Sequence, residues 1–108
     1  MKRKGKSWDE YEAELFRKGK ISEEEMLIEK MKMDFSKLIY DCRMKRHLTQ
    51  KALADKIGVK QQYIAKIESG EENLSIETIG KLLVALKSVL SVGITTQRKL
   101  TQIFRYVA

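Results

Sequence analysis

Hydrophobic residues recur at helical spacing on both sides of a single glycine in residues 48–69. These apolar positions are Leu53, Ala54, Ile57, Ile64 and Ile67. Thr49 is a suitable N-cap for the first half, and Gly58 can adopt the positive φ that ends a helix and turns the chain sharply. The pattern therefore predicts two short amphipathic helices joined by a tight glycine turn.

The second of these helices carries a polar surface rich in side-chain amides. The polar positions at its start and along it are Lys60, Gln61, Gln62, Tyr63 and Lys66. A glutamine amide holds a donor and an acceptor side by side, which matches N6 and N7 of adenine in the major groove, and an α-helix fits that groove. Gln61 and Gln62 are therefore predicted to contact bases. On this pattern alone a second interpretation stays open, that of two ordinary core helices with solvated amides.

Residues 34–90 as a whole resemble the helix-turn-helix family of phage Cro and repressor proteins, the XRE family. The resemblance is carried by Arg43, Leu48, Thr49, Gln50, Leu53, Ala54, Gly58, Val59, Ile64, Ile67, Glu68, Gly70 and the stretch from Ser75 to Leu86. It implies an all-α fold, a five-helix lambda-repressor-like bundle that binds operator DNA as a homodimer. The residues that it places at bases or phosphates are Thr49, Gln50, Lys60, Gln61, Gln62, Tyr63 and Lys66.

The same resemblance implies structural roles for four further residues. Arg43 corresponds to an arginine that pairs with the glutamate at Glu68, and Gly58 occupies the turn. Ala54 suits a position where two helices cross closely, because a larger side chain would hold them apart. One departure is Lys60, where the family often has Ser or Thr; the helix cap is then weaker, and a cation stands near the phosphates.

Residues 1–33 form an extension that a minimal repressor domain does not require. Ser22 and Glu25 make a capping box, so a helix is predicted to begin near Glu23 and to continue to about Arg46 without a glycine or proline to stop it. Before it, a short helical segment ends at Gly19. The residues that share one face of this segment are Trp8, Tyr11, Leu15 and Phe16.

This aromatic stripe has two interpretations: it folds back on its own bundle, or it anchors a partner protein. The order of a leading Trp, then Glu-Leu-Phe, then an acidic stretch is similar to HigA-type antitoxins of bacterial toxin–antitoxin modules. That resemblance implies an extension that inhibits a RelE-like ribonuclease toxin, and a helix-turn-helix that represses the shared operon. The four carboxylates in residues 9–14 suit a basic partner. The alternative is a stand-alone phage-like or mobile-element repressor without a toxin.

The C-terminal end carries a weaker pattern. Ser75 is predicted to cap a helix whose buried face includes Leu82 and Leu86. Residues 88–94 are predicted to form a final short helix followed by a strand, or a strand alone, which could pair between protomers although Gly93 weakens it. Residues 91–108 are predicted to be a C-terminal tail without an assigned function.

Composition bounds these predictions. The 108 residues contain no proline and carry a net charge of +7, of which residues 34–108 hold thirteen Lys and Arg against seven Asp and Glu. The predicted organisation is an extension (1–33), a DNA-binding domain (34–90) and a tail. With one cysteine, one histidine and no paired nucleophile, neither an enzyme nor a metal or cofactor site is predicted. No long apolar run exists, so we expect a cytoplasmic, nucleoid-associated protein without a membrane segment.

Overall fold

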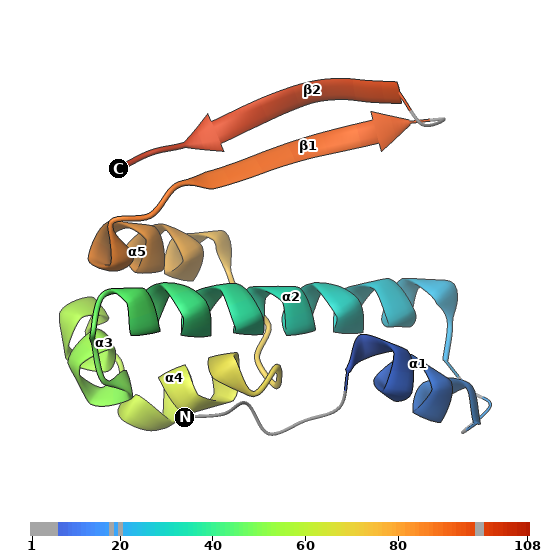
Figure 1. The fold of residues 1–108 in the computed structure, drawn as a ribbon, viewed down its shortest axis with the longest axis horizontal. Coiled ribbons are helices and arrows are strands. Elements are labelled where there is room, and N and C mark those ends of the chain that lie inside the picture. The colour runs from blue at the N-terminus through green and yellow to red at the C-terminus, as the bar shows by residue number, and fades with distance from the viewer. Residues whose placement is uncertain (1–6, 18, 20, 97–98) are drawn as a thin grey trace. The chain divides into compact units, whose positions relative to one another are not determined.

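The computed structural model describes residues 7–17, 19, 21–96 and 99–108, and the chain divides into two compact units, Met1–Leu74 and Ser75–Ala108 (Figure 1). The described elements are α1 (Trp8–Arg17), α2 (Glu23–Lys45), α3 (Gln50–Ile57), α4 (Gln61–Glu68), α5 (Ile76–Leu86), β1 (Leu90–Thr96) and β2 (Lys99–Tyr106). The predicted all-α, lambda-repressor-like helix-turn-helix fold with a helical N-terminal extension is confirmed, and in place of the single C-terminal strand that was considered, the protein has a two-stranded hairpin. The structure describes five helices, and one of them is the N-terminal helix α1.

Helix α2 is long because its start is capped and nothing in its sequence interrupts it. The Ser22 hydroxyl accepts a hydrogen bond from the Glu25 backbone N–H at 3.1 Å. The three glutamates of the first turn also stabilise the helix, because their negative charges lie at the positive end of its dipole. The helix runs for 23 residues to Lys45, and Arg46 is its C-cap. The predicted boundary between extension and DNA-binding domain, at residues 33–34, therefore lies inside a helix.

Helices α3 and α4 pack against each other, and α4 also packs on α2. The Thr49 hydroxyl caps α3 by accepting from the Ala52 N–H at 3.0 Å, and Gly58 ends α3 in the left-handed conformation, at φ 73° and ψ 36°. The core of this unit is mainly apolar, although Ser36, Arg43 and Glu68 are buried as well. Its buried hydrophobic side chains are Ile39, Leu53, Ala54, Ile57, Ile64 and Ile67.

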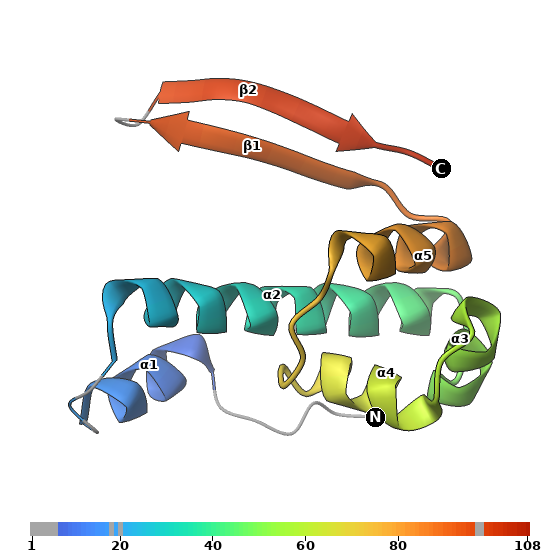
Figure 2. The same cartoon turned by 180° about the vertical axis from the view of Figure 1, so that it is seen from behind.

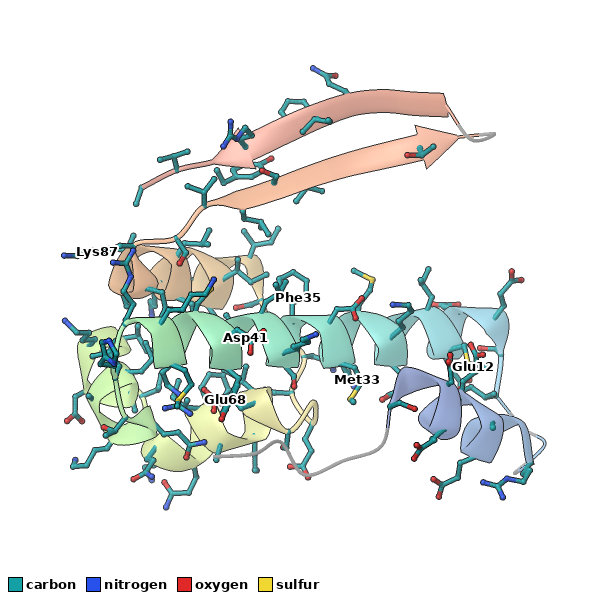
Figure 3. The ribbon with its side chains drawn as sticks, in the orientation of Figure 1. Glu12, Met33, Phe35, Asp41, Glu68 and Lys87 are labelled. Atoms are coloured by element: carbon teal, nitrogen blue, oxygen red, sulfur yellow. The ribbon has the colours of Figure 1, made fainter. Side chains whose placement is uncertain are left out.

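Helix α1 contacts α2 and lies beside its N-terminal half in both views of the ribbon (Figures 1 and 2). Not all of the apolar pattern of α2 is buried. Leu27, Met31 and Leu38, which fit the predicted apolar face of this helix, are at least half exposed. Met33 and Phe35 point to opposite sides of α2 (Figure 3).

The second unit consists of α5 and an antiparallel hairpin of β1 and β2. Ser75 caps α5, as predicted, and the helix ends at Lys87, which adopts a positive φ of 50°. Of the two alternatives for residues 88–94, the structure has the strand without a preceding helix. Residues 99–106, predicted as part of a tail, instead form β2, because Gln102, Phe104 and Tyr106 fall opposite the alternating residues of β1.

Candidate nucleic-acid interface

Helix α4 has a buried face and an exposed polar face. Ile64 and Ile67 are buried, whereas Gln61, Gln62 and Lys66 are exposed. The two amides lie in the first turn of the helix, and Lys66 follows Gln62 by one turn on the same side. The surface of α4 therefore offers two side chains that can pair with base edges and a cation that can pair with a phosphate or a guanine.

Glycine is favoured in the turn before α4 because of its backbone conformation and not because a side chain would lack room. A Cβ built at Gly58 meets no atom within 4 Å, so the positive φ of 73° is what favours glycine there. The Val59 N–H donates to the Ala54 carbonyl at 3.0 Å, which satisfies one of the last carbonyls of α3. Ala54 itself, in α3, is buried. The turn thus fixes the angle at which α4 leaves α3.

The first turn of α4 begins at Lys60, whose side chain makes no capping hydrogen bond. Its backbone is extended, as at a normal N-cap, and Lys60 is exposed. Several N–H groups at this helix start consequently lack a side-chain acceptor from the cap residue. Tyr63, in the same turn, is half-buried.

Thr49 and Gln50, at the start of α3, both have contacts within the protein. Thr49 is exposed, and its hydroxyl serves as the cap of α3. Gln50 is half-buried, and its Nε2 donates to Oε1 of Glu68 at 3.1 Å. Contact of these two residues with the DNA backbone stays a prediction, and for Gln50 the amide nitrogen is already engaged.

Arg43 and Glu68 form a buried, bidentate ion pair between α2 and α4. Arg43 Nε donates to Glu68 Oε2 at 2.6 Å, and Arg43 Nη2 donates to Glu68 Oε1 at 2.9 Å. Both residues are 5% exposed, and Glu68 projects from α4 toward α2 (Figure 3). The hydrogen bond to Glu68 raises the pKa of Arg43 above its already high ordinary value, outweighing burial, which acts in the opposite direction.

Three further contacts complete this network. Arg43 Nη1 donates to the Leu48 carbonyl at 2.7 Å, and its guanidinium lies 5.4 Å from the centre of the Tyr40 ring. Ser36, which is fully buried, donates from its hydroxyl to the Glu68 carbonyl at 2.8 Å. The network thereby ties α2 to the loop before α3 and to the end of α4.

Ser36 was not among the predicted structural residues. Its neighbours in the sequence indicate an ordinary helical serine, and its partner is a backbone carbonyl 32 positions away. The only available signal is its position one turn before Tyr40 and two turns before Arg43, on the side of α2 that meets α4.

The four predicted partner-binding residues lie on α1, but the side chains of Trp8, Tyr11, Leu15 and Phe16 lie outside the described part of the chain. Of the neighbouring carboxylates, Asp9 and Glu10 are exposed. The described part of the chain holds no group of three or more His, Cys, Asp or Glu residues that could bind a metal. Within the same part, no helix is long and apolar enough to cross a bilayer.

The fold and the exposed face of α4 define a DNA-binding helix-turn-helix protein, and comparison with known proteins agrees. A helix-turn-helix family profile, HTH_3, matches residues 39–89. An uncharacterized HTH-type transcriptional regulator of Haemophilus influenzae is 35% identical over 88 residues, covering 82% of this chain and 85% of that protein. The chain therefore belongs to the HTH_3, or XRE, family of DNA-binding transcriptional regulators, whose members are generally not enzymes.

Two solved structures are similar to part of this chain. The restriction-modification controller protein C.AhdI from Aeromonas hydrophila has a TM-score of 0.54 and 28% identity, and the match covers 56% of this chain and 87% of that one. An HTH_3 family transcriptional regulator from Vibrio cholerae has a TM-score of 0.54 and 26% identity, with 56% of this chain and 34% of that chain covered. Both matches leave more than two fifths of this chain without a counterpart.

Proposed function

We propose that this regulator binds a two-fold symmetric operator as a homodimer and represses its own operon. The observation that supports this most directly is the exposed face of α4, where Gln61, Gln62 and Lys66 stand clear of the protein core. Helix-turn-helix dimers place two such helices in successive major grooves about 34 Å apart. The excess of positive charge in residues 34–108 supplies the attraction to phosphates that such binding needs.

The proposal is tested with DNA from upstream of the gene and a scrambled duplex of equal length. The Gln61→Ala, Gln62→Ala double variant should lose operator affinity by about 1–3 kcal/mol for each bidentate contact, and keep its affinity for the scrambled duplex. Its melting temperature should change little, because both residues are exposed. Unchanged operator affinity in this variant would remove the two amides from the reading surface.

Two lysines provide a matched comparison of charge alone. Lys66 lies on α4 and Lys37 on α2, and both are exposed. Lys66→Ala should weaken binding to operator and scrambled DNA alike and reduce the slope of log K against log salt by about one. Lys37→Ala should leave that slope as it is. Equal effects of the two variants would show that only net charge matters and that α4 is not at the DNA.

We further propose that α1 gives the protein a second activity, that of an antitoxin which binds a RelE-like ribonuclease toxin. Helix α1 lies outside residues 39–89 and carries exposed carboxylates that suit a basic partner. The alternative, a stand-alone regulator without a toxin, is favoured by the likeness to a restriction-modification controller protein. The two proposals share the DNA-binding function and differ in what α1 does.

A chain that begins at Ser22 separates them, because it keeps the cap of α2 and removes α1. It should still bind the operator but fail to bind the product of the neighbouring gene. In the full chain, Trp8→Ala with Phe16→Ala should weaken that binding by about 2 kcal/mol or more for each residue if these are buried anchors. Partner binding that survives the loss of α1 would show that α1 is not the partner-binding element. A neighbouring product that binds neither chain would leave the stand-alone regulator.

A further inference from the structure

The C-terminal hairpin is amphipathic across its two faces. In its register, Leu90 pairs with Tyr106, Val92 with Phe104 and Ile94 with Gln102, so one face is largely apolar. The residues between them on the opposite face are Ser91, Gly93, Ile103 and Arg105. A sheet with this pattern needs a cover on its apolar face.

Within the second unit, Ser75–Ala108, that cover is incomplete. The apolar face and α5 line an open groove of about 690 Å³, called here the hairpin groove, to which α5 contributes Ile76, Ile79 and Leu83. Although Ile94 and Phe104 line the groove, they remain 68% and 52% exposed. A two-stranded hairpin is at best marginally stable in water, and three or more strands with an apolar face are normally required. The hairpin therefore has both an unfilled apolar face and too few strands.

The two free edges of the hairpin differ in their protection. Strand β2 carries Lys99 and Arg105, and its register shifts by one residue opposite the Ile94–Thr95 step, which marks a bulge. Charged residues and bulges both discourage further strand pairing. Strand β1, from Leu90 to Thr96, has no charged residue and no proline, and its residues 91–95 are all exposed. The edge of β1 is open to another strand.

We propose that a second copy of this chain pairs its β1 with this β1, antiparallel and across a two-fold axis. The product is a four-stranded sheet. The two β1 strands lie side by side at its centre, and the β2 strand of each copy, which carries the bulge and the charged residues, forms an outer edge. Its apolar face is continuous, and one α5 from each copy covers it. The proposal rests on the proposed function, because it assigns the dimer surface of the operator-binding homodimer.

Charge favours a second copy over a toxin as the occupant. A ribonuclease toxin is expected to be basic, but residues 88–108 contain no Asp or Glu and three cations. In the β1 pairing Lys99 and Arg105 belong to the outer strands, and β1 itself has no charged residue, so like charges do not face each other across the new edge. A two-fold axis perpendicular to the sheet makes the two β1 strands antiparallel and keeps their apolar faces on the same side. Antiparallel pairing is also the pairing that β1 already makes with β2.

Sedimentation of the full chain without DNA tests the oligomeric state, and two isoleucines form a matched pair. Ile94 lies on the apolar face of β1, and Ile103 lies on the opposite face of β2 at a similar exposure of 56%. Ile94→Lys should raise the dimer dissociation constant at least about 100-fold, because each dimer buries the cation twice. Ile103→Lys should leave it within about threefold. Equal effects of the two variants would overturn the assignment of the interface to the apolar face.

Disulfide trapping tests the edge itself in the Cys42→Ser background. Single substitutions Ser91→Cys, Val92→Cys, Gly93→Cys and Ile94→Cys sample β1, and at least one should cross-link two copies on oxidation, since paired Cα atoms lie about 4.5–5.5 Å apart. Arg105→Cys on β2 should not cross-link. Cross-linking through β2 alone, or a chain that stays monomeric and seats the neighbouring gene product in the hairpin groove, would overturn the proposal. A dimer with these contacts that fails to bind the operator would instead refute the proposed function.

Discussion

The helix-turn-helix and the hairpin use the same kinds of apolar residue but bury them to very different extents. Leu53 of α3 and Ile64 of α4 are 0% exposed, whereas Ile94 of β1 is largely exposed. The difference follows from the number of elements available to each. Helix α4 packs on both α3 and α2, while β1 and β2 have each other and line an open groove with α5. We therefore expect the second unit to need an element from outside residues 75–108 to close its core.

The two regions also treat charge differently. The helix-turn-helix buries one complete ion pair, Arg43 with Glu68, in which the atoms of both groups have partners. Of the two strands of the hairpin, β2 carries Lys99 and Arg105, whereas β1 has no charged residue. Variants that break one region but spare the other sharpen this comparison.

The largest effect is expected at the buried pair. Arg43→Met or Glu68→Met alone should lower the free energy of unfolding by about 3–5 kcal/mol, because each leaves a desolvated charge without its partner. The double variant should cost clearly less than the sum of the two. Urea denaturation of the four proteins completes the cycle. Simple additivity would mean that the two groups are not coupled, against the geometry of their two hydrogen bonds.

The second effect compares a closed core with an open one. Leu53→Ala should cost about 3 kcal/mol at any protein concentration, since it leaves a cavity in a fully packed site. Phe104→Ala should cost less than about 1 kcal/mol at low concentration, where the side chain is half exposed, and more as the chain dimerises. Denaturation at two concentrations a hundredfold apart measures both. A Phe104→Ala cost that does not depend on concentration would count against the second copy.

The third effect concerns two glycines with similar backbone angles, Gly58 with φ 73° and Gly70 with φ 79°. A Cβ at Gly58 meets nothing, but one at Gly70 would lie 2.9 Å from Met33 Sδ. Gly58→Ala should therefore cost about 1 kcal/mol from backbone conformation alone, and Gly70→Ala about 1 kcal/mol more. Adding Met33→Ala should relieve the difference at Gly70 only, which thermal melting can detect.

The contrast between the regions also explains what the sequence could predict. The helix-turn-helix depends on short-range signals: Thr49 and Ser22 as caps, Gly58 as a turn, and apolar residues at helical spacing. Each of these fixes local backbone geometry, so the corresponding elements lie where they were predicted.

The second strand depends on pairing between residues up to 16 positions apart, as between Leu90 and Tyr106. No Asn-Gly or Asp-Gly pair marks the turn, and the bulge interrupts the alternation of apolar residues in β2. Gln50 and Ser36 were equally hard to assign. Their partner, Glu68, is brought to Ser36 by packing of α4 on α2 and to Gln50 by packing of α4 on α3.

The smallest effect is expected at Lys60, where stability and DNA binding should change in opposite directions. Lys60→Ser supplies the hydroxyl cap that α4 lacks and should raise the free energy of unfolding by about 0.5–1 kcal/mol. The same change removes a cation next to the proposed reading surface. It should therefore weaken operator and scrambled DNA binding alike, and lower the salt slope by about one if Lys60 meets a phosphate.

Lys60→Ala separates the two contributions, because it removes the charge without adding a cap. The Lys60→Ala variant should lose as much salt dependence as Lys60→Ser, but its free energy of unfolding should be lower than that of Lys60→Ser. As a control, Ser75→Ala at the start of α5 measures how much a side-chain cap contributes to stability in the same chain. A stabilised Lys60→Ser protein with unchanged salt slope would place Lys60 outside the phosphate contacts and leave the DNA-facing surface to Gln61, Gln62 and Lys66.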